Sequence, residues 1–127
     1  MNLVVLRGGL SSPPRIRTLP SGDTVANLEL TTRDGVGTRS VPVAVHRPSK
    51  AVRALGAGAE VVVVGAVSRR FFSAGGATQS RTEVVADRVV SAGSRRGVAT
   101  ALDRAARRLE TVGDGPLPAA GRARSAE

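Results

Sequence analysis

Residues 60–91, EVVVVGAVSRRFFSAGGATQSRTEVVADRVVS, carry the clearest fold signal in the chain. Glu60 to Phe72 is predicted to be the longest strand, because its first half is a run of valines, which suit a buried pleated surface. Its second half is polar, so this strand is expected to project beyond the body of the protein. The glycine pair within Ser73 to Thr78 predicts a hairpin tip, from which Gln79 to Ser91 returns as a second strand.

The segments before this hairpin have the patterns of shorter strands. Four patterns each predict a strand: an apolar run that ends in a glycine pair, a short segment after a proline-containing turn, and two segments with alternating apolar and polar residues. These predicted strands are Asn2–Leu10, Arg15–Leu19, Thr24–Thr32 and Arg39–His46. In Thr24–Thr32, the side chains of Ala26, Leu28 and Leu30 fall on one face and are expected to point into the core.

A loop and a short helix complete this part of the chain. Residues 33–38 contain two glycines and predict a loop. Pro48–Leu55 predicts a helix that ends before Gly56, with its apolar residues Ala51, Val52 and Leu55 at helical spacing. Apart from the short segment Arg15–Leu19, the order is three strands, a short helix and a two-stranded hairpin. This order indicates an all-β OB-fold, a five-stranded Greek-key barrel with the helix between strands 3 and 4.

The composition points to a polyanionic partner. The chain has 127 residues and a formal net charge of +9, and all but one of its basic residues are arginines. Such a balance favours nucleic acid or an anionic membrane as partner. No apolar run approaches the roughly 20 residues of a membrane span, and residues 2–10 are too short for a signal peptide. We therefore expect a cytoplasmic protein without a membrane partner.

The residues that follow the predicted barrel form an extension. We assign residues 1–92 to the OB-fold domain and residues 93–127 to a basic tail with a helix at 100–112, followed by disorder from Gly115. Thr100 and Asp103 are expected to cap this helix. Its narrow apolar stripe suits either self-association or packing on the barrel. The stripe consists of Val98, Leu102, Ala105, Leu109 and Val112.

The predicted hairpin concentrates positive charge around the only aromatic pair. Arg69 and Arg70 precede Phe71 and Phe72, and Arg81 lies across the hairpin. Arginines can hold phosphates while a ring stacks on a base. Alternation predicts that one phenylalanine faces in and the other out. No cysteine is present and the acids are scattered, so we expect neither an enzyme nor a metal site or cofactor.

Three blocks of the first ninety residues resemble the bacterial single-stranded DNA-binding protein family. The blocks are Asn2–Gly8, Pro14–Gly22 followed by Val25–Leu28, and Gly65–Phe72 followed by Ser80–Val84. The resemblance implies an OB-fold that assembles as a homo-tetramer, with a dimer as the alternative. It also implies sequence-independent binding of single-stranded DNA in replication, recombination or repair.

The chain also departs from the family pattern. Phe72 and His46 align with aromatic positions of the family, whereas residues 35–39 lack the rings expected there. The tail is basic and ends in Arg124–Glu127, not in the family's acidic tip, so recruitment of other proteins by that route is not expected. These departures suggest a divergent paralogue.

The predicted DNA-binding residues are arginines that line a groove and two rings that stack on bases. They are Arg33, Arg39, His46, Arg47, Arg69, Arg70, Phe72 and Arg81. Two other functions fit the sequence: a primosome-type or RNA-binding OB protein, and a structural OB protein that co-assembles with another single-stranded DNA-binding protein. The response to single-stranded, duplex and RNA ligands distinguishes them.

Overall fold

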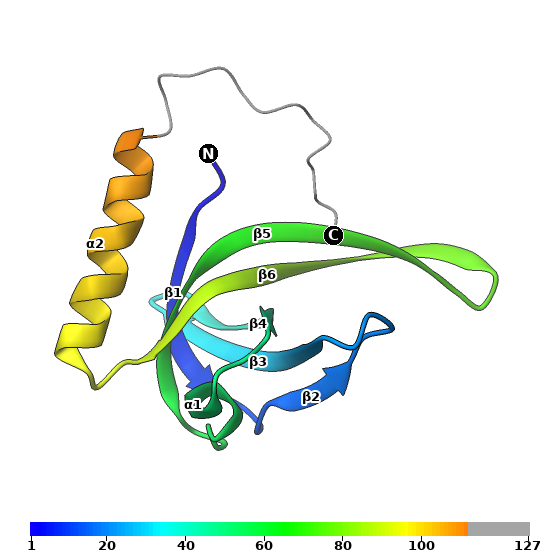
Figure 1. Cartoon of the computed structure of the whole chain (residues 1–127), viewed down its shortest axis with the longest axis horizontal. Helices are drawn as coiled ribbons and strands as arrows, with labels where there is room; N and C mark the ends of the chain where they lie inside the picture. Colours follow the sequence, from blue (N-terminus) through cyan, green and yellow to red (C-terminus); the bar gives the residue numbers. More distant parts are fainter. Residues whose placement is uncertain (112–127) are drawn as a thin grey trace.

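The computed structural model describes residues 1–111, and within them the chain forms six strands and two helices (Figure 1). These elements are β1 (Val4–Leu10), β2 (Arg15–Thr18), β3 (Thr24–Asp34), β4 (Gly37–His46), α1 (Lys50–Arg53), β5 (Glu60–Ala74), β6 (Ala77–Ser91) and α2 (Arg95–Thr111).

Five of the strands close into a barrel. Their order is β1-β5-β6-β4-β3, and β1 pairs again with β3 to complete the ring. All pairings are antiparallel except that of β4 with β6, which covers only two residue pairs. The short strand β2 pairs with β3 alone and lies outside the ring. The all-β OB-fold, with α1 between the third and fourth barrel strands, is confirmed.

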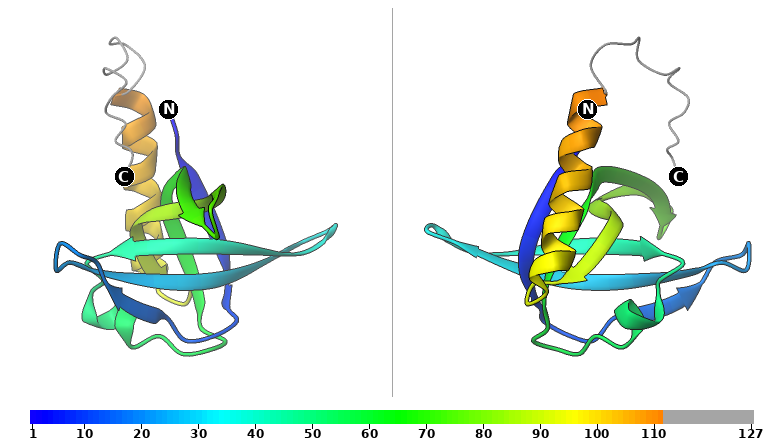
Figure 2. Two further views of the ribbon diagram at one scale, coloured as in Figure 1. Left: turned by 90° about the vertical axis from the view of Figure 1, so that its right-hand side faces the viewer. Right: turned by 60° about the vertical axis from the view of Figure 1, so that its left-hand side comes forward.

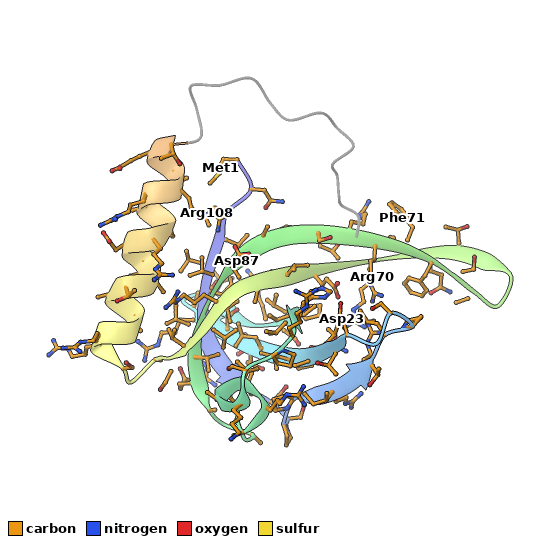
Figure 3. The ribbon with its side chains drawn as sticks, in the orientation of Figure 1. Met1, Asp23, Arg70, Phe71, Asp87 and Arg108 are labelled. Atoms are coloured by element: carbon orange, nitrogen blue, oxygen red, sulfur yellow. The ribbon has the colours of Figure 1, made fainter. Side chains whose placement is uncertain are left out.

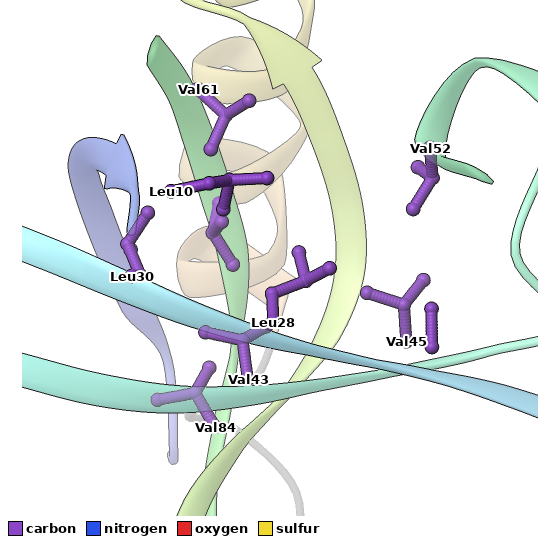
Figure 4. Close-up of a cluster of buried hydrophobic side chains, with 10 residues drawn as sticks. Leu10, Leu28, Leu30, Val43, Val45, Val52, Val61 and Val84 are labelled. Carbon is purple, nitrogen blue, oxygen red and sulfur yellow. The ribbon is translucent and has the colours of Figure 1, made fainter. Parts of the chain in front are cut away.

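The barrel is filled by valine and leucine side chains (Figure 4). Ala26, Leu28 and Leu30 of β3 are buried, as their alternation predicts, and Val61 and Val63 of β5 lie against them in the same cluster. Neither phenylalanine belongs to this core.

Two glycines allow backbone segments to approach closely within the barrel. A Cβ atom on Gly8 would lie 2.3 Å from the carbonyl oxygen of Thr31, and one on Gly65 would lie 2.2 Å from that of Val85. Gly65 follows a register shift between β5 and β6, where Asp87 is an extra residue. Both positions therefore require a residue without a side chain.

Two predicted boundaries differ from the structure. The loop expected at residues 33–38 is only a tight turn, because the Asp34 Oδ1 atom accepts hydrogen bonds from the backbone N–H groups of Val36 and Gly37 at 2.8 and 3.1 Å. The strands β3 and β4 continue up to this turn and extend beyond the barrel (Figure 2). The helix α1 is shorter than predicted, since Ser49 caps it, and Ala51 is exposed.

The helix α2 begins five residues before the predicted start. The Ser94 Oγ atom accepts a hydrogen bond from the backbone N–H of Gly97 at 3.1 Å and caps the helix. Thr100 and Asp103 are interior positions, so the capping prediction was wrong. Val112 and the predicted disorder lie outside the described residues.

Small residues dock α2 on the barrel. Ala101 and Ala105 are buried against Val64, whereas Leu102 and Leu109 stay exposed. The predicted stripe is thus only partly the contact face. Of the helices described, neither has the length and apolar character needed to cross a membrane.

Candidate nucleic-acid interface

A groove of about 420 Å³ lies on the outer side of the barrel, between β2, β3 and the β5–β6 hairpin. We call it the arginine groove because four arginines contribute to its lining. The lining residues are Ser12, Arg15, Arg17, Asn27, Leu28, Glu29, Pro42, Val43, Arg70 and Arg81. The part of the hairpin that extends beyond the barrel, residues 69–82, is called the hairpin arm (Figure 1).

The short strand β2 supplies two of these arginines. Arg15 pairs with Asn27 and Arg17 with Val25. Because residues two apart on a strand share a face, and directly paired residues lie on the same face, both arginines stand on the outward face of β3. Both are exposed, and within residues 1–111 neither forms an ion pair.

The hairpin arm supplies the other two arginines of the groove. Arg70 and Arg81 are directly paired across the arm. Each is balanced by a carboxylate: the Arg70 Nε atom lies 3.6 Å from Glu83 Oε2, and the Arg81 Nη2 atom lies 3.8 Å from Glu29 Oε2. The two like charges can stand opposite each other because each has its own counter-charge.

Both phenylalanines are exposed, Phe71 by 68% and Phe72 by 40%. The prediction that one faces the core was wrong, because the arm has left the barrel at this point and neither of its faces meets the core. Phe71 lies on the side of the arm opposite Arg70 (Figure 3). Alternation places Phe72 on the Arg70 side, and the Arg70 guanidinium carbon lies 5.9 Å from the centre of the Phe72 ring. Arg69 shares the Phe71 face.

Arg33 and Arg39 lie near the tip of the β3–β4 hairpin and outside the arginine groove. They occupy adjacent rungs, Arg33 opposite Thr38 and Arg39 opposite Thr32, so they project to opposite faces. Arg39 lies 3.9 Å from Asp34, and Arg33 lines a separate hollow with Arg7. Contact of either residue with DNA stays a prediction.

His46 and Arg47 lie at the end of β4. His46 is exposed and pairs with Val25, which on its other side pairs with Arg17. His46 therefore shares the outward face with the groove arginines, although it lines a neighbouring hollow. Arg47 adopts a left-handed conformation with φ of 51° and lies 3.4 Å from the carboxylate of Asp23.

Of the predicted DNA-binding residues, the structure thus brings Arg70, Arg81 and Phe72 together at the arginine groove. It adds Arg15 and Arg17, which were not predicted. The Arg-x-Arg spacing within a predicted strand was the signal for these two, since it places both on one face. The groove can hold consecutive phosphates on guanidinium groups beside one aromatic ring. Within residues 1–111 no group of three His, Cys, Asp or Glu residues is placed to hold a metal ion.

A known family matches most of the chain. The sequence model described as "Single-strand binding protein family" matches residues 1–92. The matched segment contains every barrel strand, β2 and α1, and it ends before α2 begins.

Proposed function

Because this chain belongs to the single-strand binding protein family, we propose that its arginine groove binds single-stranded DNA without sequence specificity, through arginine–phosphate contacts and limited base stacking. Membership of the family implies single-stranded DNA as the ligand. The groove, the contacts and the absence of sequence preference are the proposed part.

The convergence of four arginines on one face carries the proposal. OB-folds bind oligonucleotides on the face of their second and third strands, between the loops that follow strands 1 and 4. Here those strands are β3 and β4, the first loop contains β2, and the second is the hairpin arm. The arginine groove takes its lining from all four of these parts.

Stacking is expected to be limited. Phe72 lies on the groove side of the arm, and His46 stands at the edge of the same outward face. A base stacked on an aromatic ring contributes about 1–3 kcal/mol. With two rings, most of the affinity has to come from phosphate contacts. These contacts weaken as the salt concentration rises, because counterions released into a more concentrated solution gain less entropy.

The test is fluorescence anisotropy of labelled oligo-dT, a matched duplex and a matched RNA, titrated with protein at low and physiological salt. The label is placed on the nucleic acid because the chain has no tryptophan. We expect tight, salt-sensitive binding of oligo-dT and weak binding of the duplex. If oligo-dT and the duplex bind equally, and this binding vanishes at physiological salt, the proposal is contradicted and a structural role is favoured.

We also propose, on the family resemblance, that the protein acts as a homo-tetramer in replication, recombination or repair in the cytoplasm. The mass in solution tests the oligomer directly. Sedimentation equilibrium is expected to give four times the chain mass of 13.0 kDa, and a monomeric mass at micromolar protein overturns this part.

A further inference from the structure

One carboxylate stands in the floor of the arginine groove. Among residues 1–111, Glu29 is the single acidic residue that lines it, and its side chain is held from two sides. The Ser40 Oγ atom donates a hydrogen bond to Glu29 Oε1 at 2.8 Å, and the Arg81 Nη2 atom lies 3.8 Å from Glu29 Oε2. This ion pair joins β3 to β6 across the groove.

Glu83, the second acid near the groove, differs from Glu29 in its burial and in its ion-pair partner. The Glu83 side chain is only 9% exposed and pairs with Arg70 of the same hairpin, whereas the Glu29 side chain is 43% exposed. Glu83 therefore balances the charge of Arg70 within the β5–β6 hairpin. Glu29 occupies space that is open to solvent and to a bound strand.

A phosphate can take the place of this carboxylate. Guanidinium groups bind carboxylate and phosphate with the same planar donor geometry. A half-exposed ion pair at 3.8 Å stabilises the free protein only weakly, so a phosphate that carries more charge competes well for the same donors.

We propose that Glu29 is an internal competitor of DNA phosphate: in the free protein it holds Arg81, and the incoming strand displaces it. The inference rests on the proposed function of the arginine groove and assigns Glu29 as a residue that sets its affinity. The exchange replaces an arginine–carboxylate contact with an arginine–phosphate contact, so binding gains only the difference between the two contacts, and Glu29 lowers the affinity for single-stranded DNA.

The test compares Glu29→Gln with Glu60→Gln in the full chain. Glutamine keeps the shape of the side chain and the Ser40 hydrogen bond but loses the charge. Glu60 is a matched control, because it is exposed, pairs with Arg7 at 3.7 Å and does not line the groove. We expect Glu29→Gln to raise the affinity for oligo-dT by about 1.5-fold to fivefold, the range of an exposed ion pair, and Glu60→Gln to change it much less.

A second pair of variants isolates the competition for Arg81. In an Arg81→Ala background, Glu29→Gln is expected to raise the affinity no more than Glu60→Gln does. If the full gain persists without Arg81, Glu29 only repels the strand and the competition is overturned. Should Glu29→Gln fail to unfold cooperatively, Glu29→Ala is measured in its place, with the same gain expected.

The outcomes separate this inference from the proposed function. Equal affinities of Glu29→Gln and Glu60→Gln, in a protein that still prefers oligo-dT to duplex, overturn the inference alone. Loss of the preference for oligo-dT in the unmodified protein overturns the proposed function.

Discussion

Phe71 and Phe72 are neighbours in sequence with different surroundings, and they make a matched pair of variants. Phe72 lies on the Arg70 side of the hairpin arm and Phe71 on the other side. We expect Phe72→Ala to weaken oligo-dT binding by about 1–3 kcal/mol, the value of one stacked base, with little change in salt dependence. Anisotropy titrations at several salt concentrations measure both quantities. A loss of the same size in Phe71→Ala would contradict the assignment.

The same two residues mark what alternation can and cannot predict. Period-two spacing correctly placed Ala26, Leu28 and Leu30 in the core, because β3 crosses the barrel. It failed for the phenylalanines, since spacing does not reveal where a strand leaves the barrel. The missed groove residues, Arg15 and Arg17, have a readable spacing, but only the pairing of β2 with β3 places them in the groove.

At the scale of the elements, the close pairing of β5 with β6 requires a glycine at position 65. An alanine Cβ there would meet the carbonyl oxygen of Val85 at 2.2 Å, so the paired strands must move apart. We expect Gly65→Ala to lower the free energy of unfolding by about 1–3 kcal/mol, as overpacking does. Urea denaturation measures this. Gly56→Ala is the control, because no atom of residues 1–111 outside its chain neighbours lies within 4 Å of the added methyl group. An equal loss there would rule out the steric cause.

The docking of α2 is the second prediction for an element. Ala101 is buried against the barrel, whereas Ala106 on the same helix is exposed. A carboxylate at position 101 would be buried without a partner, which is costly, so Ala101→Glu is expected to release α2 while the barrel stays folded. Hydrogen exchange of the α2 amides reports the release. Ala106→Glu should keep its protection, and an unchanged exchange rate in Ala101→Glu would show that the contact is not needed.

The start of this helix also shows the limit of local signals. Thr100 and Asp103 have the spacing of a capping box, but Ser94 is the residue that caps. Two arginines and a glycine follow Ser94, so no apolar periodicity marks the first turn. The helix extends to Ser94 because the chain leaving β6 turns there, with the Ser94 backbone N–H bonded to the Ser91 carbonyl, and a turn of this kind is not visible in side-chain patterning.

For the whole molecule, the order of elements was enough to predict the barrel, but not the distribution of its charge. Both parts of the chain are basic, and the arginines are spread over strands, turns and α2. Two of those assigned to DNA from the sequence lie beside carboxylates outside the arginine groove: Arg39 beside Asp34 and Arg47 beside Asp23. The two partners of such an ion pair are brought close together by folding, so the pair could not be predicted from the sequence.

The salt dependence of binding then tests which arginines meet the strand. Arg15 and Arg17 line the groove, whereas Arg104 lies on α2, at the opposite end of the molecule from the hairpin arm (Figure 1). Each phosphate neutralised on single-stranded DNA contributes about −0.7 to the slope of log affinity against log salt, so the double variant Arg15→Ala/Arg17→Ala should make that slope shallower by about 1.4. Arg104→Ala should lower affinity slightly at low salt through net charge and leave the slope unchanged. Equal changes of slope in the two proteins would mean that the strand responds to total charge, with no defined path through the groove.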